Sequence, residues 1–446
     1  MTFWLELLIL LTCILIGARL GGIALGTVAG IGLAIFVFVL ALPPGGPPPG
    51  VLGMIIAVIT ALAAMQAAGG LDYLVSIAEK VMRRRPQHIT FVAPFATYLL
   101  CFAAGTQNVS YALLPVIAEV ARKGEVRPER PLSISVIAAF QGAVASPVSA
   151  VTVAMIGIFA ATGLSIPKLL MVMVPSTLIA VMTGALSVAW RGKKLADDTE
   201  YQRKLASGEI KPPEPLPVLD GERLTRARGS SALFLTGIIL VVMIGFFPNM
   251  RPVYEVATSG GGVDTDQVSM GYAIMIVMIA VAGLIMIIFK ASPEATLKGS
   301  IMKSGITAII SILGISWLGS SFFEGNRTTI VRTISDLVQV YPSAFAVGMF
   351  ALSTLLFSQA ATVSLLMPVG LALGLPIQLL VAFYPAAAGL FFLPTYGTVL
   401  AAVSFDQTGT TKIGKYLLNH SFMLPGLVTT IVSIVIAMLL SKILLS

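Results

Sequence analysis

The sequence predicts an all-α polytopic membrane protein made of two inverted repeats, each with five transmembrane helices and one re-entrant hairpin. Three observations lead to this fold class. Hydrophobic residues make up 57% of the 446 residues and charged residues only 11%, whereas soluble proteins carry about 25% charged residues. Apolar segments of about 20 residues, long enough to cross a bilayer, recur along the chain. Polar interruptions occupy matching places in the two halves.

The first repeat is expected to span residues 1–190. Its hydrophobicity predicts crossings near residues 2–17, 20–42, 51–68, 132–162 and 167–190. Residues 1–68 would form a scaffold, and residues 89–122 a hairpin. A broken helix at 132–162 and a helix at 167–190 would complete the repeat.

The second repeat is expected to span residues 231–446, after a hydrophilic, proline-rich linker loop at 191–230 that we place in the cytoplasm. Crossings are predicted near residues 231–248, 270–289, 298–322, 376–404 and 420–444. The corresponding parts are a scaffold at 231–322, a hairpin at 342–374, a broken helix at 376–404 and a helix at 420–444.

The two hairpins are inferred from the length of their arms. The arm at 89–104 has 16 residues, which as a helix is about 24 Å long and too short to cross the hydrocarbon core. An amphipathic stretch precedes each hairpin, at Leu71–Arg85 and Thr328–Val340. Both stretches predict helices, which either lie on the membrane surface or pack on the protein as ordinary loop helices.

The basic residues predict the orientation. With the N-terminus outside, 23 of the 28 Lys and Arg residues fall on the inner side. Each half then has an odd number of crossings, so the second half is inverted relative to the first. Both termini are expected in the periplasm, and the +8 net charge needs no nucleic-acid partner to explain it.

Polar breaks mark the expected binding site. Gly105–Asn108 and Ser358–Thr362 interrupt the two hairpins, and a proline follows each break at the same distance, Pro115 and Pro368. A second pair of breaks follows at 146–149 and 394–398. An unpaired backbone group in hydrocarbon costs several kcal/mol, so such breaks persist where they line an enclosed cavity. Paired breaks of this kind indicate the binding site of a transporter.

The chemistry of the breaks predicts an anionic substrate. Each break begins a helix inside the membrane, where free N–H groups and the positive dipole end bind anions without a buried cation. We expect Asn108 to act as an N-cap, and Ser146 to cap a helix that has Pro147 at its first position. The candidate substrate-binding residues are Thr106, Gln107, Asn108, Ser146, Pro147, Ser149, Ser358, Gln359, Thr362, Thr395, Tyr396 and Thr398.

The sequence lacks the residues that other classes of function require. The two histidines, His88 and His420, sit at segment borders, and Cys13 and Cys101 lie in apolar runs, so neither a metal site nor a cofactor is expected. A membrane-embedded enzyme would need a nucleophile and base, or a metal. No Asp or Glu lies in the central part of any predicted span, which argues against a proton pump.

Several segments resemble the anaerobic C4-dicarboxylate transporter (Dcu) family, closest to its DcuA type. The resemblance runs through nearly the whole chain and includes residues 17–22, 65–73, 114–120, 127–131, 145–149, 358–362, 393–396 and 408–414. It implies a bacterial inner-membrane carrier that exchanges aspartate, malate, fumarate and succinate. It also implies kinship with the wider ion-transporter superfamily, in which two hairpins move in one domain and a scaffold often forms a homodimer.

The chain departs from the family pattern at two positions. Gln107 stands where glycine is expected, and Gly397 where proline is expected. Both positions touch the predicted site, so they bear on substrate preference. We therefore expect a C4-dicarboxylate antiporter with an elevator-like mechanism, surrounded by lipid. A Na⁺- or H⁺-coupled symporter is the alternative within this class, and an anion channel is the alternative from another class.

Overall fold

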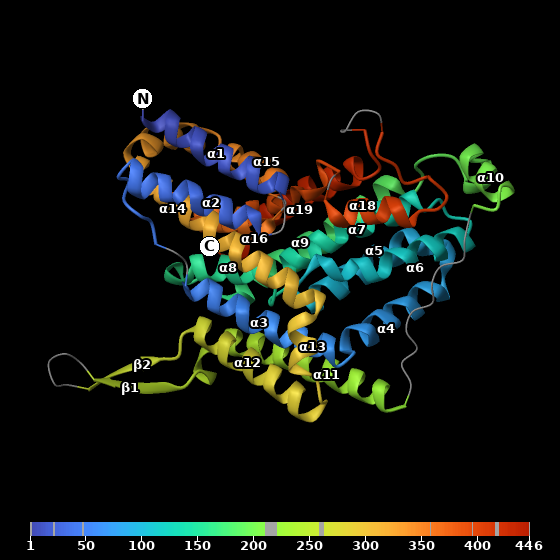
Figure 1. The fold of residues 1–446 in the computed structure, drawn as a ribbon, viewed down its shortest axis with the longest axis horizontal. Coiled ribbons are helices and arrows are strands. Elements are labelled where there is room, and N and C mark those ends of the chain that lie inside the picture. The colour runs from blue at the N-terminus through green and yellow to red at the C-terminus, as the bar shows by residue number, and fades with distance from the viewer. Residues whose placement is uncertain are drawn as a thin grey trace.

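The computed structural model describes residues 2–20, 23–46, 49–209, 221–257, 263–356, 358–394, 396–414 and 419–445 (Figure 1). These residues are mostly helical. Seven of the described helices are long and apolar enough to cross a membrane, or up to eight if one bent pair counts as a span. The prediction of a helical, polytopic membrane protein is confirmed at this level. The predicted number of ten crossings stays a prediction, because several of those segments are helices of only 10–17 residues.

The described part of the first half contains nine α-helices, a π-helical segment and the 3-10 turn of the first break. They are α1 (Thr2–Leu20), α2 (Ala24–Ala34) with the π-helical η1 (Ile35–Val39), α3 (Pro49–Ala67), α4 (Gly70–Arg84), α5 (Ile89–Ala104), η3 (Gln107–Val109), α6 (Ser110–Lys123), α7 (Glu129–Ala145), α8 (Ala150–Ile158) and α9 (Ile166–Val188). Helices α3 and α4 meet at a bend of 73°. Gly69, with φ +82°, makes this bend, because its left-handed backbone ends one helix and starts the next.

The second half follows a small helix, α10 (Thr199–Ala206), in the linker. It contains α11 (Gly221–Phe246), α12 (Met270–Ile288), α13 (Pro293–Lys298), α14 (Ser300–Val340), α15 (Ser343–Leu356), α16 (Gln359–Ala372), α17 (Ile377–Phe383), the 3-10 segment η7 (Tyr384–Phe391), α18 (Gly397–Phe405) and α19 (Met423–Leu444).

Two helices have bounds that differ from the predicted segments. Helix α11 begins at Gly221, before the predicted crossing at 231–248, and an ion pair of 2.7 Å joins Arg226 to Glu222 one turn away. The stretch Thr328–Val340 is not a separate surface helix, because α14 continues through it. The stretch contains no Gly or Pro, so nothing in its backbone interrupts the helix that starts at Ser300.

A two-stranded hairpin was not predicted. Strands β1 (Val253–Ala257) and β2 (Val263–Gln267) pair antiparallel, with Val253 opposite Gln267, and extend away from the helices (Figure 1). The sequence held the signal, because a run of β-branched and aromatic residues precedes three consecutive glycines.

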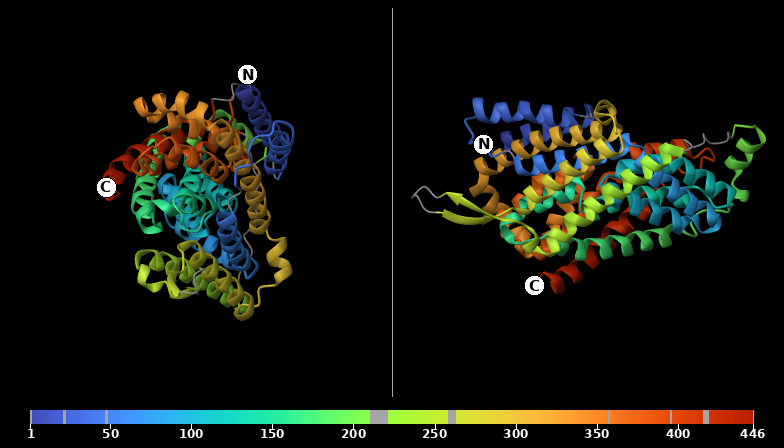
Figure 2. Two further views of the ribbon diagram at one scale, coloured as in Figure 1. Left: turned by 90° about the vertical axis from the view of Figure 1, so that its left-hand side faces the viewer. Right: turned by 90° about the horizontal axis from the view of Figure 1, so that it is seen from below.

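The helices form a central group with others on either side. Helices α5, α7, α9 and α19 pack together in the middle, with α1 and α2 on one side and α11 and α12 on the other (Figures 1 and 2). Helix α14 packs on α2 and α3, and α3 packs on α12. The helices next to the chain breaks contact the surrounding helices where α3 packs on α8 and where α14 packs on α16.

The interior is centred on α7 and η7. Every residue of α7 except Arg130 is buried, and so is every residue of η7. A helix that is buried on all sides lies in the core of a protein rather than against lipid. Both segments lead directly to a chain break, so the core holds the breaks in place.

Candidate functional site

The tip of the first hairpin is a sharp turn after α5. Gly105 has φ +66°, and a Cβ at this position would lie 2.8 Å from the carbonyl oxygen of Val148, so glycine is needed for both the turn and the packing. Thr106 then caps η3, with its Oγ1 accepting from the N–H of Asn108 at 3.3 Å. The prediction of Asn108 as the N-cap was wrong, because it lies within the 3-10 turn that Thr106 caps.

The second break separates α7 from α8 and is closed by its own side chains. Ser149 is the N-cap of α8, since its Oγ accepts from the N–H of Thr152 at 3.2 Å. The prediction that Ser146 caps this helix was wrong. Ser146 instead ends α7, and its Oγ accepts from the N–H of Val148 at 3.3 Å. Thr152 also lies 3.1 Å from the hydroxyl of Tyr384 in η7, so this break contacts the second half of the chain.

The tip of the second hairpin repeats the capping pattern of the first. Ser358 caps α16 by accepting from the N–H of Ala361 at 3.2 Å, and the Thr362 hydroxyl donates to the Ser358 carbonyl at 2.8 Å. The Gln359 side chain donates to the carbonyl oxygen of Phe140 in α7 at 3.1 Å, and both residues are buried. The second hairpin is therefore bonded to the helix that carries the second break.

The fourth break joins η7 to α18 and contacts the first hairpin. The Gln107 amide donates to the hydroxyl of Tyr396 at 2.9 Å, across 289 residues of sequence. A Cβ at Gly397 would lie 2.1 Å from the hydroxyl oxygen of Tyr111 in α6. Gln107 and Gly397, the two positions at which a departure from the family pattern is expected, thus lie at one contact between the first hairpin and the fourth break. Thr395 lies outside the described residues.

One cavity of about 930 Å³ brings all four breaks together. Seven of the predicted site residues line it, which are Thr106, Gln107, Asn108, Ser149, Ser358, Gln359 and Tyr396. Ser146, Pro147, Thr362 and Thr398 are buried but do not line it. The opposite wall comes from α1, α3 and α14, and it includes Ile55, Val58 and Leu62.

The cavity suits an anion. The first turns of η3, α8, α16 and α18 all lie on its wall, and helix N-termini carry partial positive charge. Arg19 and Lys303 also line it. Within the described lining there is no Asp or Glu. A negatively charged ligand would thus meet donors and positive charge without a repelling carboxylate.

Sequence reasoning missed the residues that act through tertiary contacts. Tyr384 contacts Thr152 at the second break and Tyr111 lies against Gly397 at the fourth break, and in both cases the local sequence carries no sign of the contact. The polar lining of α14 was also missed, although its helical spacing could have been read from the sequence. That lining consists of Ser300, Lys303, Thr307 and Ser311.

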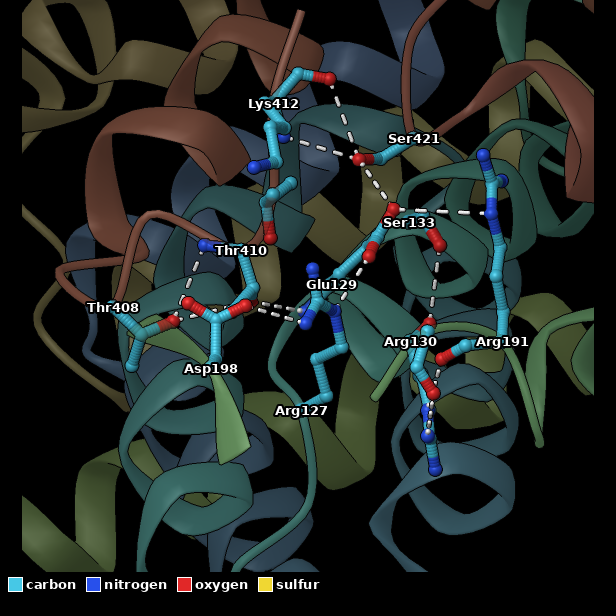
Figure 3. A network of polar contacts seen from close by, with 12 residues as sticks. Arg127, Glu129, Arg130, Ser133, Arg191, Asp198, Thr408, Thr410, Lys412 and Ser421 are labelled. Atoms are coloured by element: carbon cyan, nitrogen blue, oxygen red, sulfur yellow. Dashed lines mark hydrogen bonds and ion pairs between the residues drawn. The ribbon is translucent and has the colours of Figure 1, made fainter. Parts of the chain in front are cut away.

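A polar network holds the far end of α7 (Figure 3). Glu129 binds Arg127 at 2.8 Å and accepts from the Ser421 hydroxyl at 2.9 Å, and its N–H donates to Thr410 at 3.1 Å. Arg127 also binds Asp198 at 2.7 Å. Burial raises the pKa of Asp198, but hydrogen bonds from the Tyr201 backbone and from Arg127 bring it below the ordinary 3.8. The network joins α7 to the segment between α18 and α19.

Comparison with known proteins decides the family. The family of the anaerobic C4-dicarboxylate membrane transporter matches residues 2–445. The chain belongs to this family. The C4-dicarboxylate transporter DcuA of Escherichia coli (strain K12) is 42% identical over 424 residues, covering 94% of this chain and 95% of the relative. DcuA of Wolinella succinogenes is 39% identical over 440 residues, covering 99% of each chain.

Relatives of a second type match the chain over a similar length. The anaerobic C4-dicarboxylate transporter DcuB of Escherichia coli O6:H1 is 39% identical over 444 residues, covering 98% of this chain and 97% of the relative. These family members are named as transporters and not as enzymes, which agrees with the prediction that the chain is not an enzyme. A solved structure of Neisseria gonorrhoeae MtrF, from a class of antimetabolite efflux pumps, is 11% identical. It covers 87% of this chain and 80% of its own, with a TM-score of 0.42.

Proposed function

We propose that this protein is a secondary carrier that exchanges C4-dicarboxylates, such as fumarate, succinate, malate and aspartate, across the bacterial inner membrane. The observation that carries the proposal is the cavity where the four chain breaks meet. The family supports the substrate class, since its curated relatives are named as C4-dicarboxylate transporters.

The two halves of the chain would each hold one carboxylate. Gln107 and Asn108 come from the first hairpin, and Ser358 and Gln359 from the second, so donors from both halves face one cavity. A diacid places a negative charge at each end of a short hydrocarbon chain, which the apolar wall of α3 would accept. A monocarboxylate would leave one positive helix end without a partner.

We propose that the seven lining residues contact the substrate. Ser146, Pro147, Thr362 and Thr398 would shape the break segments behind this wall. Thr395 remains a proposed contact beside Tyr396.

Exchange is proposed as the basic mode because the cavity offers no proton carrier. The described lining contains neither a carboxylate nor a histidine. The buried carboxylate of Glu6 does not line the cavity and binds the side-chain amide of Asn326. A carrier whose site lacks carboxylates and histidines lacks the usual groups that couple a substrate to protons, which favours exchange.

We propose an elevator-like motion for the exchange. The moving unit would contain the hairpins at 89–122 and 342–374 with the segments at 132–190 and 376–444. Two observations support a shared motion. Gln359 binds α7, and Glu129 binds the segment between α18 and α19. Segments 1–68 and 231–322 would form the static scaffold and a homodimer contact.

The repeats, 1–190 and 231–446, would have inverted topology, with both termini in the periplasm and the linker 191–230 in the cytoplasm. The charge distribution along the chain supports this orientation. In a protein whose Cys13 and Cys101 are replaced, Lys193→Cys should resist a membrane-impermeant thiol reagent in intact cells and react in inside-out vesicles. Labelling in intact cells would overturn the orientation.

Counterflow in proteoliposomes tests the transport proposal. Uptake of labelled succinate is measured while internal diacid, Na⁺ and pH are varied one at a time. Internal succinate or fumarate should stimulate uptake strongly, with no requirement for a Na⁺ or pH gradient. Uptake that ignores internal diacid and follows the Na⁺ gradient would replace the exchanger with a symporter. Uptake that does not depend on internal diacid, Na⁺ or pH, and follows only the succinate gradient, would indicate a channel.

A further inference from the structure

A polar stripe runs along the scaffold side of the cavity. Ser300, Lys303, Thr307 and Ser311 are spaced by three or four residues, so they share one face of α14, and all four line the cavity. Their exposure falls along the helix. Ser300 and Lys303 are exposed, Thr307 is half-buried and Ser311 is buried. The stripe therefore leads from the solvent-facing mouth of the cavity to its interior.

Two cations stand at the mouth of the cavity. Arg19, at the end of α1, is exposed and lines the cavity together with Lys303. Neither side chain forms an ion pair within the described part of the chain, whereas Arg83, Lys123 and Arg127 near the first hairpin do. Their charge is thus available to a ligand.

Helix stability explains Arg19 but not Lys303. A cation is favourable in the last turn of a helix, which is where Arg19 lies. Lys303 lies in the first turn of α14, where the dipole is positive and a cation is unfavourable. A lysine in this position gains nothing from the helix dipole, so helix stability does not account for it.

The stripe is fixed to the scaffold rather than to the breaks. The Gln66 side chain of α3 donates to the Ser300 hydroxyl at 2.7 Å and accepts from the N–H of Ile301 at 3.1 Å. Farther along, the backbones of α14 and α2 touch, because a Cβ at Gly314 would lie 2.0 Å from the carbonyl oxygen of Gly26. The start of α14 therefore belongs to the same body as α2 and α3.

We propose that Lys303 and Arg19 form an electrostatic guide for the dicarboxylate. They attract the dianion to the mouth that faces solvent in this structure, and the hydroxyls of Thr307 and Ser311 lead it to the breaks. Because the guide is part of the scaffold, it stays behind when the breaks carry the substrate away. It therefore acts on one face of the membrane only. This inference rests on the proposed function of the same cavity.

The test compares the two faces of the membrane. First, labelling of Thr307→Cys by a membrane-impermeant reagent, in cells and in inside-out vesicles, identifies the face to which the mouth opens. The KM for labelled succinate is then measured from each face for wild type and Lys303→Gln at low ionic strength. Lys303→Gln should raise the KM at the mouth face by about three- to tenfold and leave the KM at the other face unchanged.

The charge of the ligand and the salt concentration distinguish electrostatic guidance from a structural effect of the substitution. The attraction is proportional to the ligand charge, so the change for aspartate, with one net negative charge, should be roughly the square root of that for succinate. About 1 M salt, where the screening length is about 3 Å, should remove the difference between variant and wild type. Lys303→Arg should behave like wild type, and Arg19→Gln should repeat the effect of Lys303→Gln.

Lys290→Gln is the matched control, because it removes one exposed cation outside the cavity lining. It should leave both KM values unchanged. Equal KM changes at both faces, or changes that are the same for aspartate and succinate, would overturn the guide. Unchanged KM values in Lys303→Gln would also overturn the guide. Failure of the proposed function is a different result, in which wild type itself shows no succinate counterflow. Thermal melting of each variant shows whether it is folded.

Discussion

The contact between Gly397 and Tyr111 gives the sharpest prediction. Gly397→Ala places a methyl group 2.1 Å from the Tyr111 hydroxyl oxygen, while the next ring atom, Cζ, is 3.5 Å away. The hydroxyl must therefore move by more than 1 Å, whereas the ring itself is already at an ordinary van der Waals distance. The backbone does not forbid the substitution, because the φ of Gly397 lies outside the left-handed region.

The expected cost follows from overpacking. Inserting a methyl group into a packed contact costs about 1–3 kcal/mol, which corresponds to roughly a 5- to 150-fold loss if it falls on substrate affinity. Tyr111→Phe removes only the clashing atom, so the double variant should regain most of the lost function. Tyr111→Phe alone should be close to wild type, since no hydrogen bond of its hydroxyl is seen within the described residues.

The measurement is a double-mutant cycle on succinate counterflow and on thermal stability. Wild type, Gly397→Ala, Tyr111→Phe and the double variant are reconstituted at equal density, and KM and maximal rate are fitted for each. A coupling energy of about 1 kcal/mol or more, with the sign of rescue, supports the contact. The reasoning is refuted if Gly397→Ala is harmless, or if the double variant is as impaired as Gly397→Ala.

Three further predictions concern the polar contacts. Gln107→Leu should lower thermal stability by about 1 kcal/mol by removing the bond to Tyr396, and a double-mutant cycle with Tyr396→Phe on thermal stability should show that the two changes are coupled. Ser149→Ala should lower thermal stability by about 1 kcal/mol through loss of the α8 cap, and an unchanged melting temperature would contradict this. Asp198→Asn should destabilise the protein at pH 7. Because the pKa of Asp198 in the folded protein is below the ordinary 3.8, the pair with Arg127 contributes fully above pH 3.8. In melting experiments, the difference from wild type should vanish as pH falls through the lowered pKa of the folded protein.

The positions of the breaks could be predicted from the sequence because backbone freed inside an apolar segment persists only where the protein encloses it. Ser358 and Gln359 illustrate this, since both line the cavity. The capping residues were harder to assign. Asn108 and Ser146 are good caps by type, but Thr106 and Ser149 are the residues whose extended backbone precedes a helix.

Contacts between distant segments could not be predicted. The bond from Gln107 to Tyr396 joins residues 289 positions apart, and no local pattern specifies it. The continuity of α14 was missed for another reason. Its amphipathic end resembles the stretch that forms α4, but only α4 is preceded by a glycine with left-handed backbone.

Substrate protection of a single cysteine tests the central claim that the diacid binds where the four breaks meet. Ser358→Cys is made in a protein whose Cys13 and Cys101 are replaced, and a variant that still shows counterflow is used. Ser404→Cys, exposed near the end of α18 and outside the cavity lining, is the control. Succinate should slow thiol labelling at position 358 with a half-effect near its KM, whereas acetate at the same concentration should not. It should leave position 404 unchanged. An unchanged labelling rate at position 358 in a protein that still transports succinate would contradict the account.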